Sequence, residues 1–116
     1  MKRDMDLIRQ LLFQIEADNP ELAVEGYDDK IVTKHLELLE EAGLIKAFLH
    51  KTDQSGVVQV DVERLTWEGY EFLDAARNEE VWNKTKAVVG EKSGSVTFEV
   101  LKSLLVETAR SIIFGK

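Results

Sequence analysis

The chain has 116 residues, of which 44% are hydrophobic and 32% charged, and its formal net charge is −7 at pH 7. This length and composition predict one globular domain and exclude a disordered chain. The sequence contains no cysteine, which excludes disulfides, thiol nucleophiles and thiolate metal sites. The N-terminal residues enter an amphipathic pattern directly, so we expect neither a signal peptide nor a membrane span, and a cytoplasmic location.

Apolar residues at helical spacing predict a first helix from about Asp4 to Ala17, which Asp18-Asn19-Pro20 ends. The stretch from Leu22 to Tyr27 is short and mixed, and it is more typical of a short strand or a single turn. In a standard helix-turn-helix the first helix of the motif lies at this place. The segment therefore departs from the standard motif.

A second helix is predicted from about Asp28, a suitable N-cap, to Ala42, with Gly43 ending it in a left-handed turn. Two strands at 44–51 and 57–65, joined by a polar loop that ends in glycine, then predict a hairpin. Thr66 is the expected N-cap of a third helix. Gly69 in the first turn of that helix indicates close backbone packing, since glycine weakens a helix.

Asn78-Glu79-Glu80 indicates a kink or a break, and residues 90–95 form the best linker of the chain. The last helix, about Thr97 to Phe114, is apolar over more of its circumference than one-sided packing needs. A twin helix from a second subunit is the simplest candidate for the extra contact, which predicts a homodimer. The expected dimer contacts are Phe98, Leu101, Leu105 and Ile112. We expect residues 1–90 to form the core, and 91–116 a C-terminal helix of the same domain.

The run from Lys34 to Ile45 resembles the recognition helix and the following strand of winged-helix regulators, where His-Leu-x-x-Leu-x-x-Ala-Gly-Leu is frequent. Leu65-Thr66-x-x-Gly69 resembles the strand-to-helix step after the wing of the same proteins. This resemblance implies an α+β fold, a winged helix-turn-helix-like domain with a two-stranded wing and extra C-terminal helices.

Nearly the whole chain is also similar to a narrower family of bacteria and their phages, the domain of unknown function 2513. Three segments carry this similarity, namely Met1–Arg9, Leu65–Arg77 and Val81–Lys84. The second of these segments is the specific one. The resemblance implies a winged-helix-like unit and brings no catalytic residues with it.

A winged-helix domain would contact double-stranded DNA through its recognition helix and its wing. In this chain the contacts would fall on Lys30, Thr33 and Lys34 of the helix and on Lys51, Gln54 and Ser55 of the wing. The leading hypothesis is therefore a small DNA-binding protein of bacterial or phage origin, similar to transcription regulators. Residues 28–43, however, carry a net charge of −3, and residues 66–80 carry −4. This sign repels phosphates, so the alternative is an acidic protein–protein interaction module on the same scaffold, without DNA binding.

Neither a catalytic site nor a metal site is indicated by the sequence. His35 and His50 are the only histidines, and no further ligands follow them at a workable spacing. His35 fits better as a partly buried residue of its helix. No phosphate loop, Ser-His-Asp set or nucleophile elbow is present, so we expect no enzyme, no metal and no cofactor.

Overall fold

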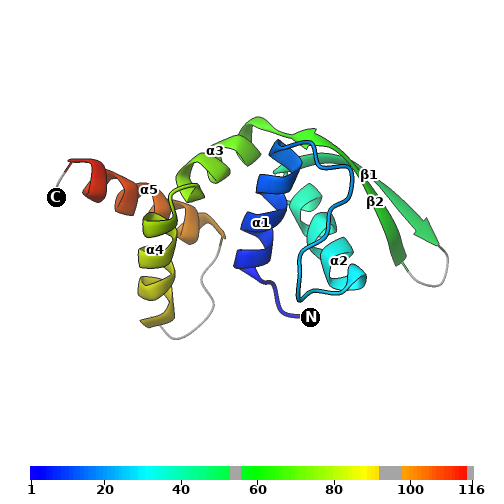
Figure 1. Cartoon of the computed structure of the whole chain (residues 1–116), viewed down its shortest axis with the longest axis horizontal. Coiled ribbons are helices and arrows are strands. Elements are labelled where there is room, and N and C mark those ends of the chain that lie inside the picture. The colour runs from blue at the N-terminus through cyan, green and yellow to red at the C-terminus, as the bar shows by residue number, and fades with distance from the viewer. Residues whose placement is uncertain (53–55, 92–97, 115–116) are drawn as a thin grey trace. The chain divides into compact units, whose positions relative to one another are not determined.

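The computed structural model describes residues 1–52, 56–91 and 98–114, without the side chains at positions 58, 89–91, 98, 99 and 112–114. These residues form five helices and one two-stranded antiparallel sheet, in the order α1-α2-β1-β2-α3-α4-α5 (Figure 1). The predicted α+β fold is confirmed, and its arrangement is compatible with a winged-helix-like domain. Contacts group the chain into two compact units, residues 1–70 and 71–116. The expected division at residue 90 stays a prediction.

Helix α1 spans Met5–Glu16, close to the predicted range. It begins where the carboxylate of Asp4 accepts hydrogen bonds from the N–H groups of Asp6 and Leu7, at 3.0 and 3.2 Å. It ends at Asp18, whose φ of 56° is left-handed and whose N–H bonds back to the carbonyl of Ile15. A short polar side chain tolerates this conformation better than most, so the helix ends without a glycine.

Helix α2 spans Asp29–Glu41, and Asp28 caps it by accepting from the N–H of Ile31 at 2.9 Å. Gly43 has a φ of 78°. The N–H groups of Gly43 and Leu44 bond to the carbonyls of Glu40 and Leu39, the pattern of a Schellman C-cap. The predicted stop of this helix is thus confirmed, and it leads the chain directly into β1.

The segment of residues 17–28 between the two helices contains no helix and no strand. One turn closes where the N–H of Tyr27 bonds to the carbonyl of Val24 at 3.1 Å. The amide of Gln14 in α1 donates to the carbonyl of Ala23 at 2.8 Å, which fixes the middle of the segment against α1. The single turn expected here is thus present, and no strand is formed.

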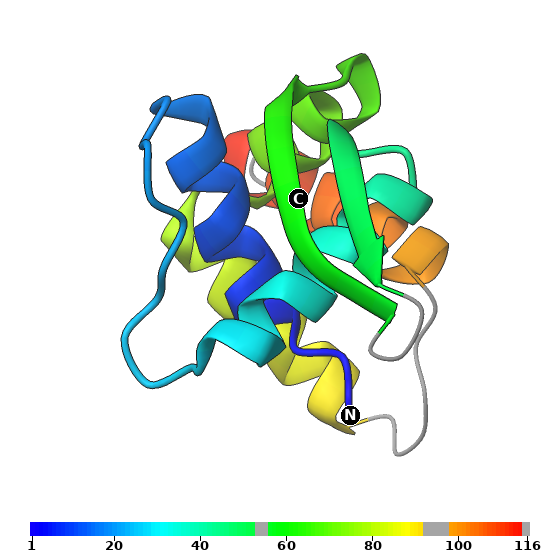
Figure 2. The same cartoon turned by 90° about the vertical axis from the view of Figure 1, so that its right-hand side faces the viewer.

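The hairpin consists of β1, Ile45–Thr52, and β2, Gly56–Leu65. Its register shifts twice, which leaves Glu63 and Val58 of β2 without a cross-strand partner. Helix α1 contacts β2, and α2 contacts both strands. Figure 2 shows the two strands side by side, with these helices next to them.

Helix α3 spans Trp67–Ala76. The Thr66 hydroxyl accepts from the N–H of Gly69 at 3.1 Å, which confirms the predicted N-cap. A Cβ at Gly69 would lie 2.0 Å from the carbonyl oxygen of Leu44, so the expected close backbone approach is also confirmed. The same carbonyl accepts from the N–H of Thr66 at 3.0 Å, and this bond ties the start of α3 to the end of the α2–β1 turn.

The second unit contains the end of α3, together with α4, Glu79–Glu91, and α5, Phe98–Phe114. The predicted break lies at Asn78, whose side chain accepts from the N–H of Val81 and starts α4. The rings of Phe72 and Trp82 meet edge to face, with centroids 6.5 Å apart. Among the described residues, no helix combines the length and the apolar character needed to cross a membrane.

A buried polar network joins the N-terminus of α1 to α2. His35 has no exposed surface, and its Nε2 accepts from the backbone N–H of Asp4 at 2.9 Å. Since Nε2 accepts, the ring proton is on Nδ1, which donates to the carbonyl of Ile31 at 2.8 Å. The Tyr27 hydroxyl donates to the Asp4 carboxylate at 2.6 Å. Asp4 thus caps its helix and also holds two other parts of the first unit.

This network predicts an alkaline loss of stability. The hydrogen bond to Asp4, followed by burial and the negative charge of Asp4, raises the pKa of Tyr27 above its ordinary value. A raised tyrosine pKa contributes stability that is complete below pH ~10 and is lost as the pH rises through the folded-state value. We expect the urea midpoint of the wild type to fall more steeply above pH ~10 than that of Tyr27→Phe. Asp4→Asn keeps a side-chain oxygen that can cap the helix but removes the negative charge. In this variant the pKa of Tyr27, followed by ultraviolet absorbance, should fall. An unchanged pKa would show that the Asp4 carboxylate does not raise it.

Candidate binding cleft

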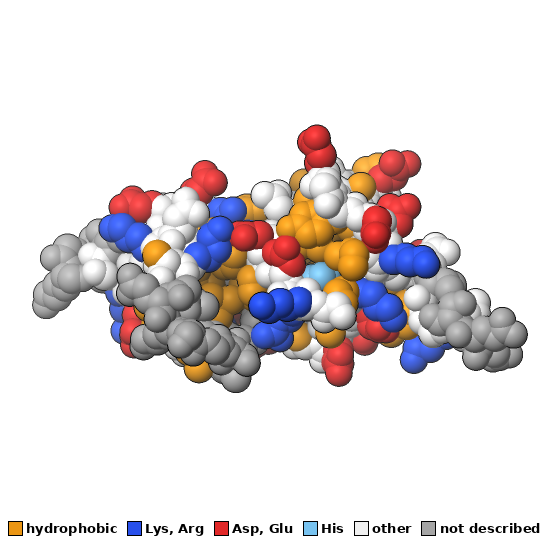
Figure 3. Space-filling model, turned by 90° about the horizontal axis from the view of Figure 1, so that it is seen from below, with side chains coloured by type: hydrophobic (Ala, Val, Ile, Leu, Met, Phe, Trp, Pro, Cys, Tyr) orange, Lys and Arg blue, Asp and Glu red, His pale blue; other side chains and the backbone are white. Residues whose placement is uncertain are grey.

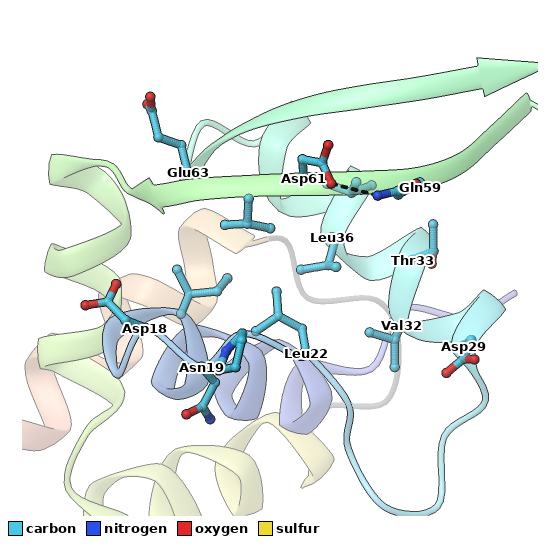
Figure 4. Close-up of a pocket in the computed structure, with 14 residues that line it drawn as sticks. Asp18, Asn19, Leu22, Asp29, Val32, Thr33, Leu36, Gln59, Asp61 and Glu63 are labelled. Carbon is cyan, nitrogen blue, oxygen red and sulfur yellow. Dashed lines mark hydrogen bonds between the residues drawn. The ribbon is translucent and has the colours of Figure 1, made fainter.

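The first unit contains an open cleft of about 490 Å³ between residues 18–22, α2 and β2 (Figure 4). Residues of α1, of the irregular segment 17–28, of α2 and of β2 meet there. The cleft is lined by Ile15, Asp18, Asn19, Pro20, Leu22, Asp29, Val32, Thr33, Leu36, Gln59, Val60, Asp61, Val62 and Glu63.

Both apolar and acidic side chains line the cleft. Figure 4 shows Leu22 and Leu36 in the space below β2, whereas the side chain of Glu63 points away from that space, on the other side of the strand. The apolar residues are those of α1, α2 and the inner face of β2, together with Leu22. Four carboxylates line the cleft, and no Lys, Arg or His occurs among its described lining residues. A lining that combines apolar side chains with charges of one sign suits a ligand that is both apolar and positively charged.

The carboxylate of Asp61 is held in place by two neighbours. One oxygen lies 2.7 Å from Nε2 of His50 on β1, and the other accepts from the Gln59 amide at 2.8 Å. The hydrogen bond with His50, and then that with Gln59, lowers the pKa of Asp61 below its ordinary value. An aspartate is ionised at neutral pH even without this shift, so the two bonds serve to fix the position of the negative charge.

The family described as "Hypothetical protein (DUF2513)" matches residues 2–95 of the chain. The chain belongs to this family. An uncharacterised protein of Haemophilus influenzae is 34% identical to this DUF2513 chain over 112 residues, which cover 90% of the chain and 92% of that relative. No solved structure matches the chain significantly. The family predicted from Met1–Arg9, Leu65–Arg77 and Val81–Lys84 is thus confirmed.

The structure describes four of the six positions expected to bind DNA in this DUF2513 protein, and their role stays a prediction. Lys30 and Lys34 are exposed on α2, and Nζ of Lys34 lies 3.9 Å from the carboxylate of Glu37. Thr33 is half-buried and lines the cleft, and Lys51 is exposed near the end of β1. The other two expected positions, Gln54 and Ser55, lie outside the described residues.

Basic and acidic side chains both occur on the face of the protein that Figure 3 shows. Around the two lysines of α2, the nearby Asp29, Glu37 and Glu41 have the opposite sign. A continuous basic area, the usual footprint of a nucleic-acid binder, is not present on this face of the described part.

The expected dimer contacts lie on α5. Leu101 and Leu105 are buried within a single chain, whereas the side chains of Phe98 and Ile112 lie outside the described part. Among the described side chains of α5, the exposed large apolar ones are Val100 and Val106. Dimerisation stays a prediction.

The two histidines have separate structural surroundings. His35 belongs to the buried network at the N-terminus of α1, and His50 contacts Asp61 on the hairpin. In the described part of the chain, no group of three or more His, Cys, Asp or Glu side chains has a geometry suited to a metal ion.

Sequence reasoning missed the cleft, although two of its signals are visible in the sequence. Val60 and Val62 alternate with Asp61 and Glu63, which indicates a strand with an apolar and an acidic face. The segment 17–28 is too irregular to form a helix. Only the structure brings these two features together.

Proposed function

We propose that this DUF2513 chain is a protein-interaction module whose acidic cleft binds a positively charged, partly apolar segment of a partner protein in the cytoplasm. The observation that carries the proposal is the combination of four carboxylates with apolar side chains in one cleft. The proposed role is binding and not catalysis.

The electrostatics support this choice of partner. Hydrogen bonds hold the carboxylate of Asp61 in place, and Asp18, Asp29 and Glu63 add further negative charge to the lining of the cleft. Charge complementarity of this kind steers association and rejects partners of the same sign. The net charge of −7 extends the attraction beyond the cleft.

The burial pattern supports an apolar contribution. Val60 and Val62 of β2 are half-buried and would supply most of this contribution, because Val32 and Leu36, which also line the cleft, are only 4% and 5% exposed. Covering such side chains completely stabilises a complex by about 25 cal/mol for each Å² of apolar surface removed from water. The carboxylates would then select the partner, while the apolar side chains add affinity.

A selection from a random peptide library displayed on phage tests the proposal. We expect the wild type to select peptides that contain both basic and apolar residues. We expect Asp61→Lys/Glu63→Lys to bind the selected peptides at least about tenfold more weakly, because attraction becomes repulsion in the cleft.

The matched control is Glu79→Lys/Glu107→Lys, which makes the same change in net charge at exposed positions outside the cleft. This variant should bind the selected peptides nearly as the wild type does. Equal losses in both variants would mean that only overall charge matters, and selection of acidic or neutral peptides would refute the proposed partner.

DNA binding is the second candidate, and the exposure of Lys30 and Lys34, one turn apart on α2, favours it. If these lysines contact phosphates, fluorescence anisotropy with mixed duplex DNA should show binding that weakens steeply with salt. Lys30→Glu/Lys34→Glu should lose this binding, whereas Lys84→Glu/Lys86→Glu on α4 should keep most of it. An absence of binding even at low salt would eliminate this candidate.

A further inference from the structure

The cleft runs along the edge of β2 rather than over one of its faces. Five consecutive residues of the strand, Gln59 to Glu63, line it. Neighbouring side chains of a strand point to opposite faces, so consecutive residues reach one cleft only where it follows the strand's edge. The edge in question is the one opposite β1, because the sheet has two strands and β1 occupies the other edge.

No part of the described segment 17–28 pairs with this edge. Its backbone N–H groups at Ala17, Asp18 and Asn19 bond to carbonyls of α1, and that of Tyr27 bonds within its own turn. The side chains of Gln14 and Asp4 further hold the segment to α1 through Ala23 and Tyr27. Alternate N–H and C=O groups of β2 therefore face the cleft without a strand partner in this part of the chain.

The charges along this edge of β2 indicate which kind of strand could pair with it. An unpaired edge is a template for another strand, and charged side chains and bulges usually discourage pairing with a copy of the same protein. Here Asp61 and Glu63 would face the same carboxylates of a second copy, which disfavours self-pairing. A strand that carries lysine or arginine would meet opposite charge instead.

We propose that the partner segment binds as a third strand of the hairpin sheet, paired with β2 along residues 59–63. This inference rests on the proposed function and specifies how the partner is held. Its backbone would hydrogen-bond to β2, its alternate apolar side chains would contact Leu22, Val32 and Leu36, and its basic side chains would lie near Asp61 and Glu63. Strand addition of this kind derives affinity from the main chain and specificity from alternate side chains.

A short synthetic peptide in which lysine and valine alternate is a suitable probe for the whole chain. Two further peptides carry N-methyl groups on alternate backbone nitrogens, one set in each of the two registers. N-methylation removes the donors on one edge of the peptide strand and leaves those on the other edge. We expect one N-methylated peptide to bind at least about tenfold more weakly than the parent peptide and the other to bind nearly as well. Hydrogen exchange should show slowed exchange at alternate amides of residues 59–63.

The outcomes separate the two proposals. If all three peptides bind equally and Asp61→Lys/Glu63→Lys weakens each of them, the cleft binds basic segments but not as a strand, and this inference is overturned. If the parent peptide does not bind and the library yields no basic peptides, the proposed function itself fails. If the parent peptide binds without a change in exchange along β2, strand addition is also overturned.

Discussion

Gly69→Ala should destabilise the first unit by more than about 3 kcal/mol, the largest effect expected of a single methyl group in this chain. The new Cβ would lie 2.0 Å from the carbonyl oxygen and 3.0 Å from the carbonyl carbon of Leu44. Both atoms are backbone, so no side-chain rotation relieves the clash. The same carbonyl accepts from the N–H of Thr66, and pushing it away weakens that bond as well.

The sign of this effect is informative, because alanine is normally the better helix former. Without the close approach, Gly69→Ala would stabilise α3 by about 1 kcal/mol. Gly43→Ala is the matched control: its Cβ meets nothing within 4 Å, but its φ of 78° is left-handed. We expect this control to cost only about 1 kcal/mol in urea unfolding followed by circular dichroism. Equal costs for the two variants would show that the contact between α3 and Leu44 is not tight.

His35→Ala should cost about 3 kcal/mol, the second large effect. The change opens a cavity at a side chain with no exposed surface and leaves the N–H of Asp4 without its acceptor. Each of these effects costs a few kcal/mol or less in proteins, and here they act at one place. The loss is measured as a lower urea midpoint of unfolding. The dependence of the unfolding free energy on urea concentration should stay unchanged, since a change in it would indicate a different unfolded state.

Two variants separate the hydrogen bond from the packing. His35→Gln offers an oxygen near the position of Nε2, so it should recover part of the loss by accepting from Asp4. His50→Ala removes an exposed histidine of the hairpin and should change stability by less than about 0.5 kcal/mol. If His35→Gln is as unstable as His35→Ala, the network contributes packing alone.

Local chemistry made most of the elements predictable. Asp28 and Thr66 act through side-chain oxygens that accept from N–H groups three residues on, and Gly43 acts through its left-handed backbone, so the limits of α2 and the start of α3 could be predicted from neighbouring residues. The alternation of Val60 and Val62 with Asp61 likewise predicted β2. These features depend on contacts within a few residues of one another.

The cleft could not be predicted in the same way, because it depends on contacts between distant residues. The path of residues 17–28 is set by bonds from Gln14 to Ala23 and from Tyr27 to Asp4, which no periodicity indicates. The burial of Leu101 and Leu105 within one chain could not be predicted either. An apolar helix has the same sequence pattern whether its own chain or a second subunit covers it. The resemblance to winged-helix proteins predicted a binding role for the lysines of α2 and none for the carboxylates beside them.

The most direct test is to map backbone amide chemical shifts while the alternating lysine–valine peptide is added to the isotope-labelled chain. Binding in the cleft should shift the amides of residues 18–22, 32–36 and 59–63, and Asp61→Lys/Glu63→Lys should abolish these shifts. Shifts confined to the exposed lysine face of α2, or to the second unit, would place the binding surface elsewhere and overturn the proposed function.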